Sequence, residues 1–312
     1  MTKHIYVYSP SGAVRDRAAF RRGVKRLQAL GHSVEVDADA LRSHQRFAGD
    51  DDTRLAAIAR AAASGADVAL ISRGGYGLTR ILDRIDYAAM AQAVGRGTHF
   101  VGISDFTAFQ LALMARTGCV SWAGPALCEG FGTEPEPDDI MEDCFNDLLL
   151  GQGEGCGWRM PAAPRSTPMA AGTPGGDVHL KNATLWGGNL AVLCSLVGTP
   201  YLPKVQGGVL FLEDVAEPVY RVERMLSQLL HAGVLGKQKA IVLGQFTEYK
   251  LTPHDRGFNL KTVAQWLRSQ VQACVLENLP YGHVQTKVLL PVGARVELVV
   301  EGRDALMAWG HL

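Results

Sequence analysis

Short apolar runs alternate with helical patterns through the first half of the chain, usually with a glycine or proline turn between them. The runs that read as strands cover residues 4–8, 32–36, 66–72 and 99–103. The helical patterns between and after them cover residues 15–29, 53–63 and 106–113. This alternation is typical of a parallel sheet covered by helices. We therefore predict an α/β fold class.

Ser104 stands where one of these runs changes from strand to helix. Val101 and Ile103 suit a buried strand, whereas Phe106 and Phe109 lie on one face of a helix. A serine at this junction is either a helix cap or a nucleophile presented on a tight strand-to-helix turn. The third apolar run, 66–72, leads into Arg73-Gly74-Gly75-Tyr76-Gly77, and ligands of open α/β sheets bind at such strand ends. We expect the turns at Gly74 and Ser104 to lie on the same edge.

Composition changes sharply in the middle of the 312-residue chain. Residues 151–176 are rich in Gly, Pro, Ala and Ser and show little periodicity, which favours a linker or an irregular hairpin. We therefore predict an N-terminal domain over 1–150, a linker over 151–178 and a C-terminal domain over 179–312. At the end of the chain, 287–291 and 295–300 read as short strands in a hairpin-like arrangement.

Charge and cysteine usage exclude several classes of protein. Lys plus Arg and Asp plus Glu both number 31, so net charge favours neither nucleic acid nor an anionic membrane as a partner. The apolar run at Ile5–Tyr8 is too short for a signal peptide or a membrane span, which predicts a cytoplasmic protein. Six scattered cysteines and nine histidines show no metal-ligand spacing. We expect no metal and no cofactor.

Two carboxylates and a histidine stand at strand ends or turns in the second half. Glu213 closes an apolar run, Glu217 follows it beside a proline and within reach of Arg221, and His283 follows a glycine. A serine hydroxyl becomes a good nucleophile when an imidazole takes its proton and a carboxylate orients that ring. Each residue taken alone also reads as an ordinary surface or capping group.

An oxyanion formed at a carbonyl also needs two backbone amides. Asp105, directly after Ser104, would supply one, and Gly74 or Gly75 the other. The Asp105 carboxylate itself reads as structural, in the first turn of a helix.

Together these segments resemble the LD-carboxypeptidase family of serine peptidases, which includes muramoyltetrapeptide carboxypeptidase and the microcin C self-immunity enzymes. The resemblance spans nearly the whole chain in family order. Its segments are IYVYSPSG, SRGGYGLTRILDRIDY, GISDFTAFQLAL, Gly124-Pro125, LWGGNLAVLCSLVGTPYLP, VLFLEDVAEPVYRVERMLSQLLHAGVL and LPYGHVQTKVLLPVGARVEL. An α/β-hydrolase fits less well, because Gly102-Ile103-Ser104-Asp105-Phe106 lacks the second glycine of G-x-S-x-G.

The resemblance implies that Ser104 is the nucleophile, Glu213 the triad glutamate and His283 the base. It implies an N-terminal α/β sandwich with a mostly parallel sheet, a smaller β-rich C-terminal domain, a triad assembled across the two and commonly a homodimer. The implied reaction releases the terminal D-alanine from a small peptide substrate, a murein tetrapeptide that is free or muramyl-linked, in peptidoglycan recycling. RFAGDDDTRL and VERMLSQLLHAGVL look like the cytoplasmic murein-recycling type.

Two other functions stay open at this point. One is an amidase or peptidase of the same fold that acts on a peptidyl-nucleotide antibiotic such as microcin C. The other is a non-catalytic protein that binds a small ligand, with Ser104 as a helix cap. A substrate carboxylate would need an arginine, and a nucleotide an aromatic platform. Our candidates for substrate binding are Arg73, Tyr76 and Arg224, with Arg80 as a further basic group.

Overall fold

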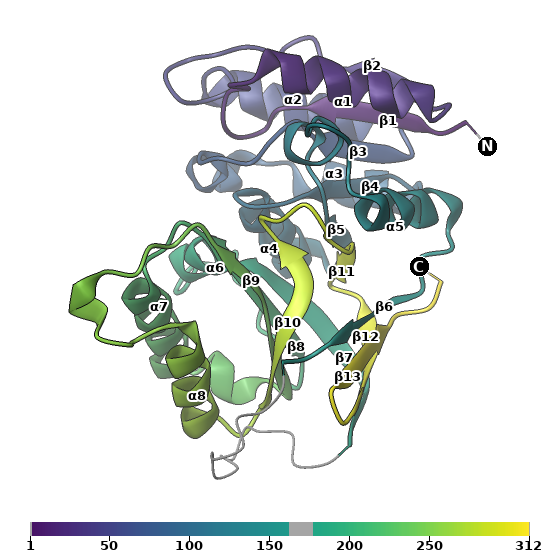
Figure 1. Cartoon of the computed structure of the whole chain (residues 1–312). Helices are drawn as coiled ribbons and strands as arrows, with labels where there is room; N and C mark the ends of the chain where they lie inside the picture. Colours follow the sequence, from purple (N-terminus) through teal and green to yellow (C-terminus); the bar gives the residue numbers. More distant parts are fainter. Residues whose placement is uncertain (1, 162–176, 312) are drawn as a thin grey trace. The chain divides into compact units, whose positions relative to one another are not determined.

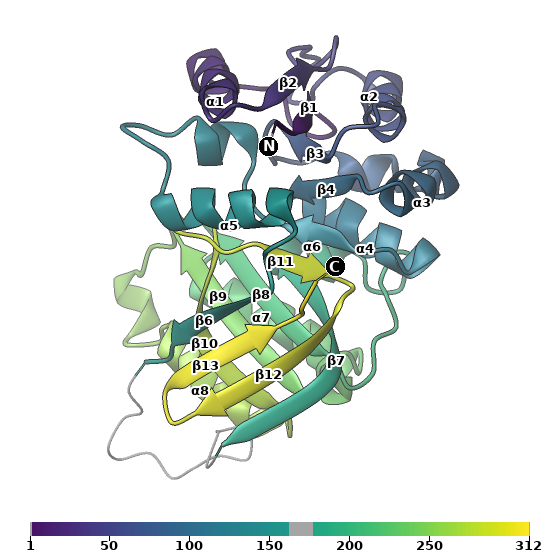
Figure 2. The ribbon, with the colours of Figure 1, turned by 90° about the vertical axis from the view of Figure 1, so that its right-hand side faces the viewer.

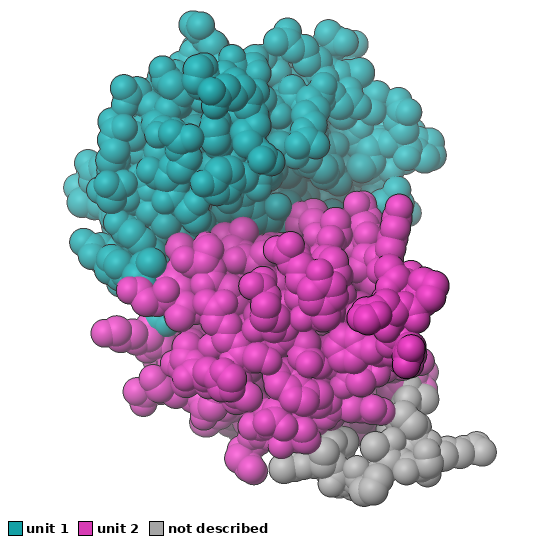
Figure 3. All heavy atoms as spheres, turned by 90° about the vertical axis from the view of Figure 1, so that its left-hand side faces the viewer, with its two compact units in different colours: residues 1–153, 199–203, 285–293 teal, residues 154–198, 204–284, 294–312 magenta. Residues whose placement is uncertain are grey.

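The computed structural model describes residues 2–161 and 177–311 and divides into two compact units. Apart from the undescribed residues, the first unit contains 1–153, 199–203 and 285–293, and the second contains 154–198, 204–284 and 294–312. Figure 3 colours the two units separately. The helices of the described residues include none with the length and apolar character needed to cross a membrane.

The first unit is built on a six-stranded sheet in the order β11-β5-β4-β3-β1-β2. Its strands are β1 (His4–Tyr8), β2 (Ser33–Val36), β3 (Val68–Ile71), β4 (His99–Gly102), β5 (Ser121–Ala123) and β11 (Leu290–Val292). All neighbouring pairs are parallel except β11 with β5. The predicted α/β class and its mostly parallel sheet are therefore confirmed.

Helices cover both faces of this sheet. They are α1 (Arg17–Ala29), α2 (Asp51–Ala63), α3 (Tyr87–Gly95), α4 (Phe106–Thr117) and α5 (Asp139–Leu150), with single turns η1 (Leu78–Arg80), η2 (Leu82–Arg84) and η3 (Leu127–Phe131). In Figure 2, α1 and α5 lie on one face and α2, α3 and α4 on the other. Aspartates cap four of these helices, because their carboxylates accept the first free amides: Asp16, Asp50, Asp86 and Asp138.

The second unit has a mixed seven-stranded sheet in the order β10-β9-β8-β7-β12-β13-β6. Its strands are β6 (Gly155–Arg159), β7 (Val178–Asn189), β8 (Val209–Val215), β9 (Ala240–Thr247), β10 (Cys274–Gly282), β12 (Arg295–Glu301) and β13 (Asp304–Ala308). Strands β7 to β10 pair in parallel, and β12, β13 and β6 extend the sheet in antiparallel pairs.

Three helices accompany the parallel strands of the second unit: α6 (Leu190–Ser195), α7 (Val219–His231) and α8 (Leu260–Gln270). Figure 1 labels them beside β8, β9 and β10. The described residues of this unit also form two short turns, η4 (Leu235–Lys237) and η5 (Pro253–Asp255). The C-terminal part is therefore rich in strands, as the resemblance implied, and also contains helices.

Two of our expectations about chain organisation were wrong. The segment 151–178 is not a linker throughout, because β6 pairs with β13; its residues 162–176 lie outside the described part. The segments 287–291 and 295–300 do not form a hairpin, since β11 joins the first unit and β12 the second. A short apolar run indicates a strand but does not specify its partner. The C-terminal domain predicted over 179–312 accordingly loses 199–203 and 285–293 to the first unit.

Candidate active site

Ser104 lies two residues after the end of β4 at Gly102, and its backbone is left-handed, with φ of 67°. A residue with a side chain adopts this conformation at a cost of roughly 1–2 kcal/mol, and such strain is characteristic of functional turns. Helix α4 has Asp105 at its N-cap and no side-chain capping bond. Ser104 is thus not the helix cap that the sequence left open.

The glycine turn after β3 packs against Ser104. Strands β3 and β4 are parallel neighbours, so their following turns share one edge, as predicted. A methyl group placed on Gly74 would lie 2.5 Å from Cβ and 2.8 Å from Oγ of Ser104. Gly75 has φ of 121°, and a methyl group there would lie 3.0 Å from Cα of Gly12. Only glycine allows the backbone to approach the serine this closely.

The carboxylate of Asp105 is 2% exposed and faces the interior of the first unit. It accepts hydrogen bonds from Oγ of Ser11 at 2.5 Å and from the amide of Leu78 at 2.9 Å. Burial raises the pKa of this carboxyl. Its contacts fit the structural role expected for the side chain, although they bind neighbouring loops rather than the helix. The backbone amide of Asp105 keeps its predicted oxyanion role as a proposal.

In the second unit, Glu213 and His283 form a hydrogen-bonded pair. Nδ1 of His283 lies 2.7 Å from Oε2 of Glu213, whose side chain is fully buried in β8. The imidazole directly follows β10 and remains 23% exposed. Gly282, with φ of 143°, allows this arrangement, because a methyl group there would lie 2.8 Å from the Gln245 carbonyl oxygen and 3.3 Å from Cβ of Glu213.

Two polar residues that sequence reasoning missed support this pair. Nδ2 of Asn189 donates to Oε1 of Glu213 at 3.2 Å and to Oδ1 of Asp214 at 3.0 Å. Its Oδ1 accepts the amide of Val192 at 3.1 Å, so the same side chain caps α6. Burial, reinforced by the charge of Glu213, raises the pKa of Asp214 to about 6. An asparagine between two glycines and a helical pattern was the signal that could have indicated Asn189.

Glu217, the competing acid, pairs with Arg221 at 2.7 Å across one turn at the start of α7. This is the partner its position suggested. The contact with the imidazole belongs to Glu213 instead.

The candidate substrate-binding residues differ in their surroundings. Arg73 lies 3.5 Å from Glu129 and, with Arg15 and Arg22, lines a cavity of about 470 Å³ in the first unit. Arg80 pairs with Asp51 at 3.1 Å on the surface of that unit. Arg80 lines a separate cavity of about 370 Å³ with Asp50, Asp51 and Asp52, so the two arginines belong to different cavities of the first unit.

Tyr76 and Arg224 are both exposed. The ring of Tyr76 is 45% exposed and lies 5.9 Å from the ring of Phe47, with the guanidinium of Arg46 at 5.7 Å over its face. Arg224 is exposed on α7 of the second unit, where its charge acts on the thiol of Cys194. Among the described residues, no group of three or more His, Cys, Asp or Glu side chains could hold a metal ion.

Comparison with known proteins identifies the family. Residues 5–124 match the LD-carboxypeptidase N-terminal domain, and residues 182–298 match the LD-carboxypeptidase C-terminal domain. A muramoyltetrapeptide carboxypeptidase from Oxalobacter formigenes superposes with a TM-score of 0.85 at 36% identity, covering 98% of each chain. The chain belongs to the LD-carboxypeptidase family. The resemblance inferred from the sequence is thereby confirmed.

Other relatives agree with this assignment. A putative carboxypeptidase from Synechocystis is 31% identical over 94% of this chain and 90% of its own. The structure of the microcin C7 self-immunity protein MccF in complex with aspartyl sulfamoyl adenosine has a TM-score of 0.85 at 23% identity, over 100% of this chain and 97% of that one. At that identity the likeness shows the shared fold.

Proposed function

We propose that this protein is a serine-type LD-carboxypeptidase that releases the terminal D-alanine from murein tetrapeptides. The observation that carries the proposal is the strained Ser104 at a glycine turn, in a chain that also holds a buried carboxylate bonded to an imidazole. The 36% identity to a muramoyltetrapeptide carboxypeptidase supports the substrate class.

In the proposed mechanism, Glu213 accepts the Nδ1 proton of His283 in a hydrogen bond and so leaves Nε2 free to act as a base. Nε2 takes the proton of the Ser104 hydroxyl while Oγ attacks the carbonyl carbon of the L,D amide. The C–N bond then breaks, and the imidazolium returns its proton to the leaving amino group of D-alanine. Water hydrolyses the acyl-enzyme by the same base, which restores the serine.

The amides of Asp105 and of Gly74 or Gly75 would stabilise the negative oxygen of the tetrahedral intermediate. The close packing of Gly74 on Ser104 supports this role. Arg73, in its cavity, is our candidate for the substrate carboxylate, because a guanidinium binds carboxylates in two parallel hydrogen bonds. The resemblance further supports a cytoplasmic homodimer.

A second candidate substrate is a peptidyl nucleotide. The exposed ring of Tyr76 would offer a nucleobase an aromatic face, and the MccF fold is shared.

The test is incubation with free and anhydromuramyl tetrapeptide, and separately with aspartyl sulfamoyl adenosine, followed by mass spectrometry. Loss of one alanine from the tetrapeptides supports the carboxypeptidase, whereas cleavage of the nucleotide alone supports the second candidate. A chelator added to the active reaction should leave the rate unchanged.

A further inference from the structure

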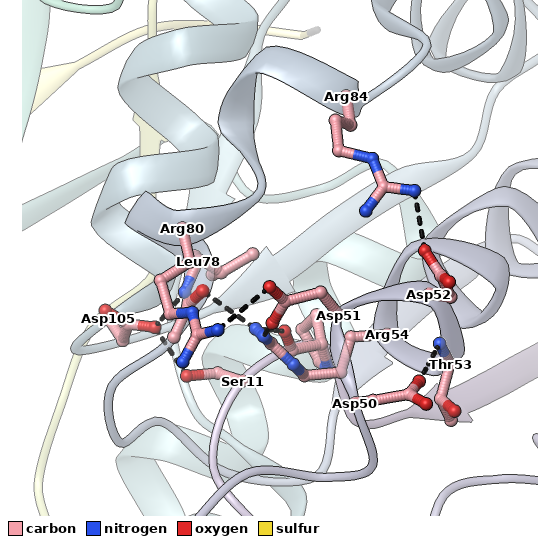
Figure 4. Close-up of polar contacts among 12 residues, drawn as sticks. Ser11, Asp50, Asp51, Asp52, Thr53, Arg54, Leu78, Arg80, Arg84 and Asp105 are labelled. Atoms are coloured by element: carbon pink, nitrogen blue, oxygen red, sulfur yellow. Dashed lines mark hydrogen bonds and ion pairs between the residues drawn. The ribbon is translucent and has the colours of Figure 1, made fainter.

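The side chain of Asp105 joins the loops that follow three neighbouring strands of the first unit. Its Oδ2 accepts hydrogen bonds from Ser11, in the loop after β1, and from Leu78, beyond the glycine turn after β3. Asp105 itself follows Ser104 after β4. Figure 4 shows both donors directed at this one carboxylate.

These contacts form part of a closed ring of residues that includes Ser104. Gly12, next to Ser11, donates its amide to the carbonyl oxygen of Gly74 at 3.2 Å. Gly74 in turn is the residue that packs directly against Ser104. The path from Ser104 through Asp105, Ser11, Gly12 and Gly74 therefore returns to Ser104. A closed ring of contacts fixes the position of the glycine turn relative to the serine.

Arg54 holds the same two loops from a second point. Its side chain is fully buried, and Nη1 donates to the carbonyl oxygen of Gly77 at 2.7 Å and of Pro10 at 3.5 Å. Its Nη2 pairs with Asp51 (Figure 4). Two buried charged groups thus hold the same two loops: Arg54 binds the carbonyl oxygens of Pro10 and Gly77, and Asp105 binds the hydroxyl of Ser11 and the amide of Leu78.

Burying the carboxylate of Asp105 lowers the stability of the fold more than a purely structural contact would require. Asp105 is almost fully buried, and Ser11 and Leu78 are neutral donors. Asp37 is equally buried, at 3%, but Arg60 binds both of its oxygens. A buried carboxylate without a bonded cation is expensive, and apolar packing would stabilise the fold at lower cost.

We propose that Ser11 and Asp105 are positioning residues, which hold the Gly74–Gly75 turn beside Ser104 in the geometry that the transition state requires. The proposal rests on the proposed function of Ser104. Because the side chains of Ser11 and Asp105 contact the catalytic turn and have no part in the proposed substrate contacts, their loss should lower kcat and leave KM nearly unchanged. Displacements of about 1 Å at such a site cost on the order of 100-fold in rate.

The experiment compares Ser11→Ala, Asp105→Ala, Asp105→Asn and the Ser11→Ala/Asp105→Ala double variant. Asparagine can keep both hydrogen bonds, because a single oxygen accepts them. We expect kcat to fall about 100-fold in Asp105→Ala and roughly tenfold or less in Asp105→Asn and Ser11→Ala. The double variant should match Asp105→Ala, because both changes open the same ring.

Tyr6→Phe is the matched control. It also removes a hydroxyl that donates to a buried carboxylate, since Tyr6 donates to Asp37 at 2.6 Å, but this pair lies outside the ring. We expect its kcat to change less than twofold. The proposal is wrong if Ser11→Ala loses no more kcat than Tyr6→Phe, if the losses appear in KM, or if the double variant loses the product of both single effects.

A second readout separates this proposal from the proposed function. A small fluorophosphonate would react with Ser104 in the absence of any peptide, and the rate of this labelling should depend on the same turn. If wild type is labelled but releases no alanine, the substrate assignment fails and the labelling rates of the variants still decide the role of the ring. If wild type is neither labelled nor active, Ser104 is not a nucleophile and both proposals fall.

Discussion

Nδ1 of His283 lies 2.7 Å from Oε2 of Glu213, a carboxylate with no exposed surface. Strand β8 holds this carboxylate, and Asn189 binds its other oxygen. A buried, doubly bound carboxylate fixes both the orientation and the tautomer of an imidazole. The pair therefore has the geometry required of a general base with its orienting acid.

Replacing Glu213 by glutamine should lower kcat by about 10⁴, because the amide no longer selects the required tautomer. Glu217→Gln should lower it less than tenfold, since Glu217 pairs with the half-exposed Arg221 and such ion pairs contribute about 0–1 kcal/mol. Steady-state kinetics on the tetrapeptide compares the two variants. A larger loss for Glu217→Gln would reverse the assignment of the acid.

Ser104→Ala should remain folded and lose activity by on the order of 10⁴ or more. Ser104→Gly should be equally inactive but more stable than Ser104→Ala by about 1 kcal/mol, because glycine adopts φ of 67° without strain. Chemical unfolding of both variants measures the difference. Equal stability would mean that the left-handed turn stores no strain, and retained turnover would exclude Ser104 as the nucleophile.

The sequence predicted where helices and strands form better than it predicted which strands pair with each other. The α4 segment is buried on nearly every side, yet its apolar residues and the preceding glycine still marked a strand followed by a helix. By contrast, β11 and β12 are only two residues apart and join different sheets, which no local pattern encodes.

At the site, the sequence indicated residues that lie in a turn directly after a strand, because the neighbouring residues alone mark such a turn. Gly74 and Ser104 are examples, each in the turn after its own strand. It did not identify Ser11 or Asn189, because their roles depend on hydrogen bonds to Asp105 and Glu213, which are distant in the sequence. Serine and asparagine are common in turns and before helices for local reasons, so their types alone carried no signal of these long-range contacts.

Gly74→Ala should abolish most of the activity, because the new methyl group would lie 2.5 Å from Cβ of Ser104 and one of the two groups must move. Gly95→Ala is the control. Gly95 ends α3, and a methyl group there meets nothing within 4 Å. We expect Gly95→Ala to keep full kcat and to gain up to about 1 kcal/mol in stability. Activity in Gly74→Ala within threefold of Gly95→Ala would show that the turn does not need its close approach to Ser104.

The stability of the protein should depend on pH through Asp214. Its pKa in the fold is about 6, because burial and the charge of Glu213 oppose ionisation, whereas an unfolded aspartate titrates near 3.8. Between these values the folded state binds more protons than the unfolded state, so the contribution of Asp214 to stability falls as pH rises from about 4 to 6 and is constant above. The full difference corresponds to at most roughly 3 kcal/mol.

Asp214→Asn removes this titration and loses part of the hydrogen bonding to Asn189 and the Ala191 amide, which changes stability by a pH-independent amount. The free energy of unfolding of wild type minus that of Asp214→Asn should therefore decrease between pH 4 and pH 6.5.

Asp37→Asn is the control. Burial raises the pKa of Asp37, but hydrogen bonds from Arg60 and Tyr6 lower it by more, so that its pKa is lowered overall. The contribution of Asp37 to stability is lost only as pH falls below the ordinary pKa of an aspartate, 3.8. The free energy of unfolding of wild type minus that of Asp37→Asn should therefore be flat from pH 5 to 6.5. Denaturant titrations across this range give both differences, and a flat difference for Asp214→Asn would mean that Asp214 is not held in its protonated form by burial beside Glu213.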